Sequence, residues 1–249
     1  MIHYDLHPRI TAFTTTKTYG RNATTLCPAL GVPIERFARP HQVHGTNVLH
    51  ITEQIFSLSA AERTTLLDGV DAVIYNVRNA CIGISTADCI PVVVYDPEHH
   101  CAAAIHAGWR GTVARIVVKA IAEMQRVFAT HPEQLLCAIG PGISFDSFEI
   151  GDEVWQAFAD AQFDMQHISR RYPASSQQTA SSQVEETTVA TEKWHIDLKE
   201  CNRLQLIDAG VKPANITLSP LDTMTDDRFY SARREGAATG RILSGIVLR

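Results

Sequence analysis

The chain has 249 residues, of which 45% are hydrophobic and 20% are charged, and its formal net charge is −5. This length can bury a sizeable core in one large domain or two small ones. The charge argues against nucleic acid as a main partner, since phosphate backbones are bound by clustered Lys and Arg. No apolar run is long enough to span a bilayer, and no basic segment followed by an apolar core opens the chain. We therefore expect a cytoplasmic protein with no membrane partner.

Short and nearly continuous apolar runs predict four buried strands, over residues 70–75, 80–85, 90–95 and 101–106. Runs of this kind are typical of a sheet that is covered on both faces. A turn-forming segment joins the last two runs, and we predict that these two strands form a hairpin.

The hydrophobic period changes in the middle of the chain. Apolar residues recur at helical spacing from Thr112 to Phe128, which predicts one amphipathic helix that begins at Gly111 or Thr112. Three more strands and two more helices are predicted, the strands over 135–139, 215–219 and 242–248 and the helices over 152–161 and 197–209. The segment at about residues 173–193 is rich in Ser, Thr, Gln and Ala. We interpret it as a mobile surface insertion within a single domain.

Two adjacent apolar runs carry residues that could bind a metal. One apolar run ends in Cys89, which follows an acidic residue, and the next ends in His106, which is followed closely by glycine, tryptophan and arginine. His44 lies upstream, next to Gly45. Catalytic zinc sites commonly use three Cys or His ligands and leave one position open for water, whose pKa the metal lowers. We predict a zinc site at His44, Cys89 and His106, and copper could occupy the same ligands.

Charged residues near these motifs are candidates for catalysis and substrate binding. Asp88 precedes Cys89 and on a strand would point away from the ligands, so both a catalytic role and a supporting role stay open. Arg110 could hold an anion such as phosphate together with backbone N–H groups at a helix start, or lie on the surface beside Trp109. Asp71 is interpreted as a turn carboxylate.

A second group of candidates lies near the C-terminus. Arg233 and Arg234 follow two aromatic residues. Such arginines could bind phosphate or stack on a base, and they could equally pair with surface carboxylates.

Several segments, taken together and in order, resemble one known family. They are Gln42-Val43-His44-Gly45, Thr86-Ala87-Asp88-Cys89-Ile90-Pro91, His106-Ala107-Gly108-Trp109-Arg110-Gly111, Ile139-Gly140-Pro141 and Phe229-Tyr230-Ser231-Ala232-Arg233-Arg234. The chain is similar, from about residue 38 to its end, to the YfiH-like polyphenol oxidase (laccase-domain) family. Its members are also described as purine nucleoside phosphorylases and as peptidoglycan editing factors.

The resemblance implies an α/β (α+β) fold in which mixed β-sheets pack between helical layers. It implies zinc ligands at His44, Cys89 and His106. The implied activity is phosphorolysis of adenosine, inosine, guanosine and methylthioadenosine to base and sugar 1-phosphate, with adenosine deamination. Copper-dependent oxidation of phenols is a further activity described for the family.

Purine nucleosides and phosphate are the partners that this resemblance implies. The residues expected to act in catalysis are Asp88, Cys89 and His106. The residues expected at the substrate or phosphate are Gln42, Lys17, Arg110, Arg233 and Arg234.

Two positions depart from the family pattern. Lys17 stands where members usually carry an arginine, and Met224 stands where they carry a cysteine. Lys17 keeps the charge but lacks the planar fork of arginine, and Met224 keeps bulk but lacks the thiol. We therefore expect altered substrate anchoring with an intact set of metal ligands.

Two other classes of function stay open on the sequence. In a metal-free hydrolase of amides or of peptidoglycan precursors, Cys89 would be the nucleophile and His106 its base. The chain could instead be a zinc-stabilised binding protein, for which a closed site of four protein ligands would be the evidence. The oligomeric state and the preferred nucleoside are not indicated.

Overall fold

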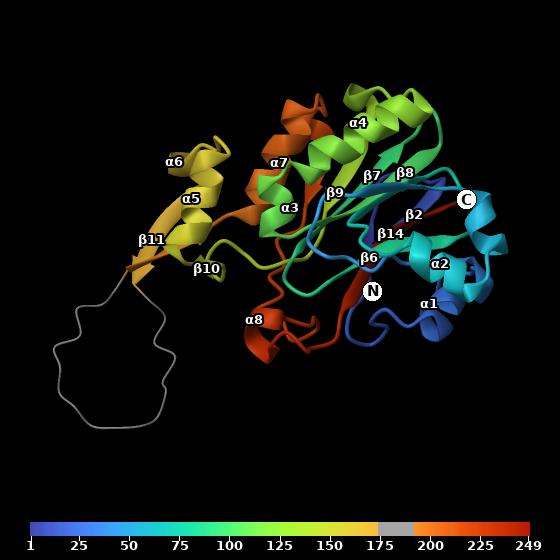
Figure 1. Ribbon diagram of the computed structural model, residues 1–249, viewed down its shortest axis with the longest axis horizontal. Helices are drawn as coiled ribbons and strands as arrows, with labels where there is room; N and C mark the ends of the chain where they lie inside the picture. The colour runs from blue at the N-terminus through green and yellow to red at the C-terminus, as the bar shows by residue number, and fades with distance from the viewer. Residues whose placement is uncertain (174–191) are drawn as a thin grey trace.

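Two large β-sheets form the centre of the molecule (Figure 1). The structure is a computed structural model, and it describes residues 1–173 and 192–249. The strands of the five-stranded sheet are, in spatial order, β1 (Ile2–Tyr4), β2 (Ile10–Thr14), β14 (Ile242–Leu248), β6 (Cys81–Thr86) and β3 (Phe37–Ala38). Those of the six-stranded sheet are β13 (Ile216–Leu218), β9 (Leu136–Ile139), β7 (Ile90–Asp96), β8 (Cys101–Ala107), β5 (Ala72–Tyr75) and β4 (Val48–Ile51).

The two sheets pack face to face. Strand β7 is apolar throughout because both of its faces are buried. Ile90, Val92 and Val94 belong to the core beneath the helices. Val93 and Tyr95 belong to the core between the two sheets. Since successive side chains of a strand point to opposite faces, a strand that is covered on both sides has no polar alternation. The hairpin predicted from this run is confirmed, because β7 and β8 pair as antiparallel neighbours.

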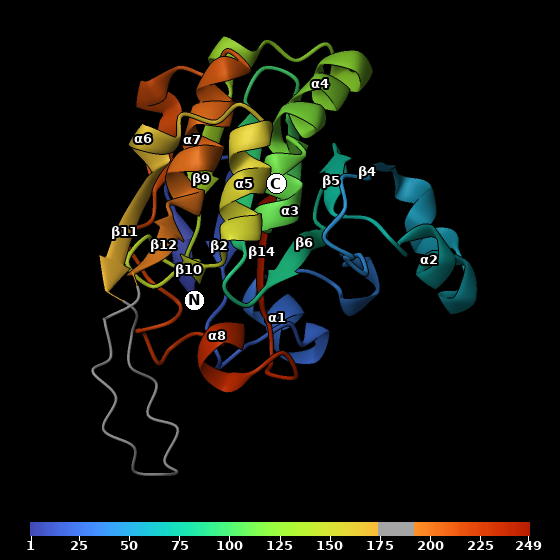
Figure 2. The same cartoon turned by 60° about the vertical axis from the view of Figure 1, so that its left-hand side comes forward.

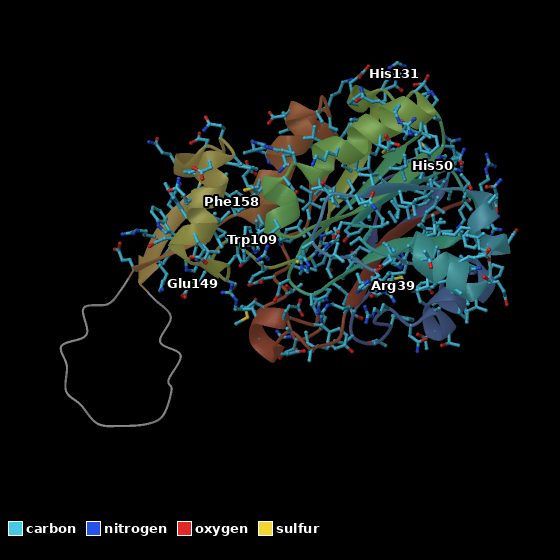
Figure 3. All side chains as sticks on the ribbon, in the orientation of Figure 1. Arg39, His50, Trp109, His131, Glu149 and Phe158 are labelled. Atoms are coloured by element: carbon cyan, nitrogen blue, oxygen red, sulfur yellow. The ribbon has the colours of Figure 1, made fainter. Side chains whose placement is uncertain are left out.

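Helices cover the outer faces of both sheets. The outer core of the six-stranded sheet includes residues from α4 (Ile116–Phe128), α5 (Asp152–Asp160) and α7 (Leu198–Asp208), and Phe158 of α5 is completely buried (Figure 3). A smaller core joins α1 (Ala23–Ala29) to the other face of the five-stranded sheet. The predicted fold class, mixed sheets packed between helical layers in a single domain, is therefore confirmed.

The remaining elements are short. The helices are α2 (Ala60–Leu66), α3 (Trp109–Val113), α6 (Met165–Ile168) and α8 (Ala232–Glu235), and the 3₁₀ turns are Ile34–Arg36, Glu53–Ser57, Pro132–Gln134 and Pro213–Asn215. None of the helices in the described ranges combines the length and the apolar character needed to cross a membrane.

A small third sheet stands beside α5 and α6 (Figure 2). Its strands, in spatial order, are β10 (Glu149–Ile150), β12 (Glu192–Ile196) and β11 (Ser169–Pro173). The insertion predicted at about 173–193 falls mostly outside the described residues. Its two ends do not: Pro173 pairs with Glu192, so both ends belong to strands. The polar composition of this segment gave no sign of these strands, because exposed strands need no apolar period.

The single helix predicted from Thr112 to Phe128 is wrong, because the segment contains two helices. Helix α3 starts after Gly108, and α4 starts after Arg115. Arg115 has a φ of 62°, and a right-handed helix cannot continue through a residue in this left-handed conformation. Its guanidinium lies 4.0 Å from the centre of the Phe163 ring and donates to the Ala161 carbonyl oxygen, which fixes the break. Both helices bury their apolar faces in the same core, so the hydrophobic period runs on unchanged.

Candidate active site

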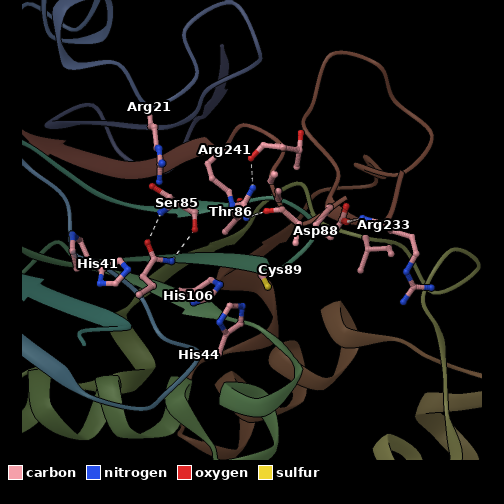
Figure 4. A pocket seen from close by; sticks show the side chains of 18 of the residues that line it. Arg21, His41, His44, Ser85, Thr86, Asp88, Cys89, His106, Arg233 and Arg241 are labelled. Carbon is pink, nitrogen blue, oxygen red and sulfur yellow. Dashed lines mark hydrogen bonds between the residues drawn. The ribbon is translucent and has the colours of Figure 1, made fainter. Parts of the chain in front are cut away.

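The structure brings His44, Cys89 and His106 together at one end of the paired strands (Figure 4). Cys89 lies in the turn between β6 and β7, and His106 lies in β8. Pro91 is opposite His106 in the antiparallel register, which places the start of β7 beside the end of β8. One donor atom from each of the three residues lies within 4.8 Å of the other two. His106 is buried, Cys89 is half-buried and His44 is exposed.

The buried carboxylate of Asp71 holds two of these three residues in place. It accepts hydrogen bonds from the backbone N–H groups of Val43, His44 and Gly45 at 2.8 to 3.2 Å. It also bonds Nδ1 of His106 at 2.8 Å. With Nδ1 engaged, the free ligand atom of His106 is Nε2. A carboxylate in this position orients a metal-binding histidine and makes it more basic.

The sequence did not reveal this role of Asp71. The only local signal is an acidic residue directly before a completely buried strand. A carboxylate at such a place needs partners, and the structure supplies them from a loop far away in the sequence.

Gly108 lets Cys89 and His44 approach each other. A Cβ atom at this position would lie 3.0 Å from Sγ of Cys89 and 3.0 Å from Cδ2 of His44. Contacts this short are tighter than normal carbon contacts, so a larger residue would push the ligands apart. The glycine after His106-Ala107 is thus a steric requirement of the site.

The thiol and the imidazole stabilise each other's charged forms. Burial raises the pKa of Cys89, but the nearby imidazoles of His106 and His44 outweigh it and lower the pKa to about 6. Burial lowers the pKa of His106, but Cys89 and Asp71 outweigh it and raise this pKa to about 9. At neutral pH the group therefore contains a thiolate, the form of cysteine that binds metals.

The three side chains fit a transition-metal ion. One thiolate and two imidazoles are the donors that zinc and copper prefer, and the carboxylate of Asp71 supplies an outer partner. The group contains three ligand residues among those that the structure describes. One coordination position would face the adjoining cavity.

That cavity has a volume of about 690 Å³, which is within the range of small-molecule sites. His44, Cys89 and His106 all line it, together with Gln42, Ser85 and Thr86. The Gln42 amide donates to the carbonyl oxygen of Ser85 at 2.7 Å and accepts from its N–H at 2.8 Å. Gln42 thereby fixes the loop that carries His44 to the end of β6.

Asp88 lies in a turn with a φ of 79°, and the strand assumed for it is incorrect. Its carboxylate accepts hydrogen bonds from Oγ1 of Thr223, Oγ of Ser231 and the N–H of Arg233, at 2.6, 3.0 and 2.7 Å. Asp88 lines the cavity, but these three bonds commit it to holding the C-terminal segment 223–233 against the site.

Three of the predicted anion-binding residues lie elsewhere. Arg110 is exposed, stacks 4.2 Å from the centre of the Trp109 ring and is not among the residues that line the cavity. Lys17 pairs with Glu235 at 2.8 Å and borders a neighbouring depression. Arg234 donates to the carbonyl oxygens of residues 223, 224 and 229, so it supports the backbone.

Four arginines do line the cavity: Arg21, Arg39, Arg233 and Arg241. Of these, sequence reasoning singled out only Arg233. Arg39 stands three residues before Gln42, which is the one local signal that could have pointed to it. Arg21 and Arg241 reach the cavity from the two ends of the chain, and no spacing rule links them to the ligands.

Comparison with known proteins agrees with this geometry. Residues 15–249 match the model of the family described as multi-copper polyphenol oxidoreductase laccase. A purine nucleoside phosphorylase of Bacteroides thetaiotaomicron is 44% identical over 229 residues, which are 92% of this chain and 79% of the relative. A protein named adenosine deaminase RL5, from an unknown prokaryotic organism, is 40% identical over 89% of this chain and 79% of its own length.

A solved structure shows the same fold. The crystal structure of YlmD from Geobacillus stearothermophilus has a TM-score of 0.81 at 26% identity and covers 99% of this chain and 94% of that one. The family that the motifs resemble is thus confirmed by sequence and by structure. The chain belongs to the multi-copper polyphenol oxidoreductase laccase family.

Proposed function

We propose that this protein is a zinc-dependent purine nucleoside phosphorylase. The observation that carries the proposal is the group His44, Cys89 and His106, which lines the same cavity as four arginines. The relative from Bacteroides thetaiotaomicron, which is named for this activity, supports it at 44% identity. The substrates would be adenosine, inosine, guanosine or methylthioadenosine, together with phosphate.

In phosphorolysis, a phosphate oxygen forms a bond to the anomeric carbon while the bond from that carbon to the purine nitrogen breaks. The electron pair of the broken bond goes to the purine, and the proton of hydrogen phosphate neutralises it. A zinc ion would supply a Lewis acid that polarises an oxygen ligand. Asp71 holds Nδ1 of His106 and so leaves Nε2 free to hold such an ion, and Gln42 keeps the His44 loop in place. Gln42 and Arg233 are the predicted substrate residues that line the cavity.

Adenosine deamination is a second candidate activity for the same site. The relative named adenosine deaminase RL5 favours it, at 40% identity. In this reaction water adds to the purine carbon that carries the amino group, and ammonia leaves with a proton taken from that water. Phosphate takes no part, so the two reactions can be measured separately.

The test is an assay of purified protein with adenosine and phosphate, combined with metal analysis. We expect near-stoichiometric zinc and release of adenine with ribose 1-phosphate. Cys89→Ala should lose the zinc and lower the phosphorolysis rate at least about 100-fold, since a ligand is removed. Cys137→Ala is the matched control, because Cys137 is a buried thiol of β9 outside the site, and it should keep both properties.

Other outcomes would contradict the proposal. A zinc-loaded protein that releases no purine base would exclude phosphorolysis. Metal-free protein that loses activity when Cys89 is alkylated would instead support a Cys/His hydrolase, including one that edits peptidoglycan precursors. Copper in place of zinc, with oxidation of phenols, would support the polyphenol oxidase alternative.

A further inference from the structure

Two of the cavity arginines have guanidinium groups with no partner among residues 1–173 and 192–249. Arg241 donates to the carbonyl oxygens of residues 237, 239 and 240, and Arg233 donates to that of Glu149. Arg21 and Arg39, in contrast, make no hydrogen bond and no ion pair to any residue that the structure describes. Nε of Arg39 is itself buried and unpaired. Buried donors without acceptors are rare in folded proteins and destabilise them.

These two cations are also close enough to repel each other. Burial lowers the pKa of Arg39, and the charge of Arg21 lowers it further. Like charges held close together are unfavourable, and an anion between them removes the repulsion. The arrangement therefore has the electrostatics of an anion-binding site.

Two hydroxyl groups at the end of β6 add further donors. Ser85 and Thr86 line the same cavity, and they are only 7% and 1% exposed. Oγ of Ser85 and Oγ1 of Thr86 are buried and have no hydrogen-bond partner within residues 1–173 and 192–249. The backbone of Ser85 is already paired with Gln42, so this strand end is held rigidly.

The topology explains why these donors meet. Strand β3 runs parallel to β6, with Ala38 opposite Ile82, so Arg39 follows at the level of Gly83, two residues before Ser85. Arg21 comes from the segment just before α1 and lies on the far side of Ser85 from the three ligands (Figure 4). The cavity thus has a ligand-bearing end and a cationic end.

We propose that Arg21, Arg39 and the hydroxyl groups of Ser85 and Thr86 form a subsite for a phosphate dianion. Arginine forks and hydroxyl donors match the several acceptor oxygens of such an anion. The inference rests on the proposed function, to which it adds the residues that hold the attacking phosphate. The same chemistry would suit inorganic phosphate or a 5′-phosphate on the nucleoside, and the test separates these two sources.

The first measurement is the KM for phosphate at saturating adenosine. Arg39→Gln should raise the KM for phosphate at least tenfold. The KM for adenosine, measured in the deamination reaction without phosphate, should change by a smaller factor. Ser85→Ala should raise the KM for phosphate by a smaller factor than Arg39→Gln does. Arg126→Gln is the charge-matched control, since it removes an exposed arginine that pairs with Glu123 on α4. It should change neither the KM for phosphate nor the KM for adenosine. Zinc content and far-ultraviolet circular dichroism show whether each variant is folded.

The second measurement is direct binding of inorganic phosphate to the zinc-loaded protein by calorimetry. Wild type should bind, and Arg39→Gln should bind at least tenfold more weakly. If wild type turns over but the KM for phosphate of Arg39→Gln is unchanged, the subsite is wrong and the proposed function stands. If wild type binds phosphate through Arg39 but releases no base, the subsite stands and the proposed function falls.

The third measurement compares AMP with adenosine as ligands in the absence of inorganic phosphate. If inorganic phosphate is the source, adenosine should bind at least as well as AMP, and Arg39→Gln should affect both alike. If AMP binds more tightly and loses this advantage in Arg39→Gln, the subsite serves a 5′-phosphate. Wild type that binds neither inorganic phosphate nor the phosphate of AMP would overturn the subsite.

Discussion

At the scale of single residues, Asp71 does most to organise the site. One carboxylate receives three backbone N–H groups of the His44 loop and the imidazole of His106, and it is completely buried. Burial raises the pKa of Asp71, but hydrogen bonds from His106 and from the loop outweigh it, so the net shift is downward. Asp71 is therefore ionised at neutral pH, and its charge favours positive charge at the neighbouring imidazole.

We predict that Asp71→Asn weakens zinc binding about 10- to 100-fold, because an amide cannot accept all four of these hydrogen bonds. Competition against a coloured chelator measures this affinity. Asp68→Asn is the matched control, since Asp68 is exposed and pairs only with the exposed His41. Equal zinc affinities for the two variants would show that Asp71 does not orient the ligands.

At the scale of elements, β6 and β14 approach each other through a pair of glycines. Gly83 lies opposite Gly245 in the antiparallel register. A Cβ atom on Gly83 would lie 2.5 Å from the carbonyl oxygen of Ser244, and one on Gly245 would lie 2.2 Å from that of Ile82. Neither glycine has a positive φ, so the requirement is for space. This close approach of the two strands lies two residues before Ser85, so it helps to set the position of the strand end that lines the cavity.

We expect Gly83→Ala to lower the free energy of unfolding by about 1 to 3 kcal/mol, because the added methyl group must displace backbone. Urea denaturation followed by circular dichroism measures the change. The same variant should weaken phosphate binding, since Ser85 and Thr86 follow directly on the strand. An unchanged denaturation midpoint would mean that the two strands have more freedom to separate than the register indicates.

At the scale of the whole molecule, the three candidate metal ligands come from three separate segments of the chain. These are the loop before β4, the turn before β7 and the end of β8, and residues of the C-terminal segment line the same cavity. The strands that follow or carry these residues, β4, β7 and β8, all belong to the six-stranded sheet. A bound ion would therefore oppose separation of these strands when the protein unfolds.

Removal of zinc by a chelator should lower the melting temperature, and re-addition should restore it. At free zinc 100 times its Kd, binding to the folded state alone contributes about 2.7 kcal/mol. Differential scanning calorimetry measures the shift, and Cys89→Ala should show none. A melting temperature that is the same with and without zinc would be evidence against binding at these three residues.

The sequence predicts the buried parts of this fold better than its edges. Strands such as β7 and β8 are apolar over their full length, and their hairpin can be predicted from the turn between them. Strands β1 and β4 are short and half-buried, so no apolar pattern of useful length marks them, although β1 pairs with the next strand along the chain. The break at Arg115 is hidden because both helices face one core.

The candidate site divides in the same way. Cys89 directly precedes β7 and His106 lies near the end of its hairpin partner β8, so local spacing is enough to predict that they meet. Asp71, Arg21 and Arg39 acquire their surroundings only through pairing between distant segments, which spacing does not encode. Arg110 sits inside a strong motif, but the first turn of α3 directs it to solvent. A motif identifies residues that lie together in the chain, and the fold decides which of them face the cavity.

The central place of β14 has a consequence for how the protein is made. Residues 242–248 lie between β2 and β6, which are paired with β14 on either side and not with each other. Until this strand has left the ribosome, both neighbours expose an unpaired edge, and such edges invite association with other chains. The five-stranded sheet is therefore completed only after synthesis of residue 248, and a nascent chain would need protection from aggregation until then.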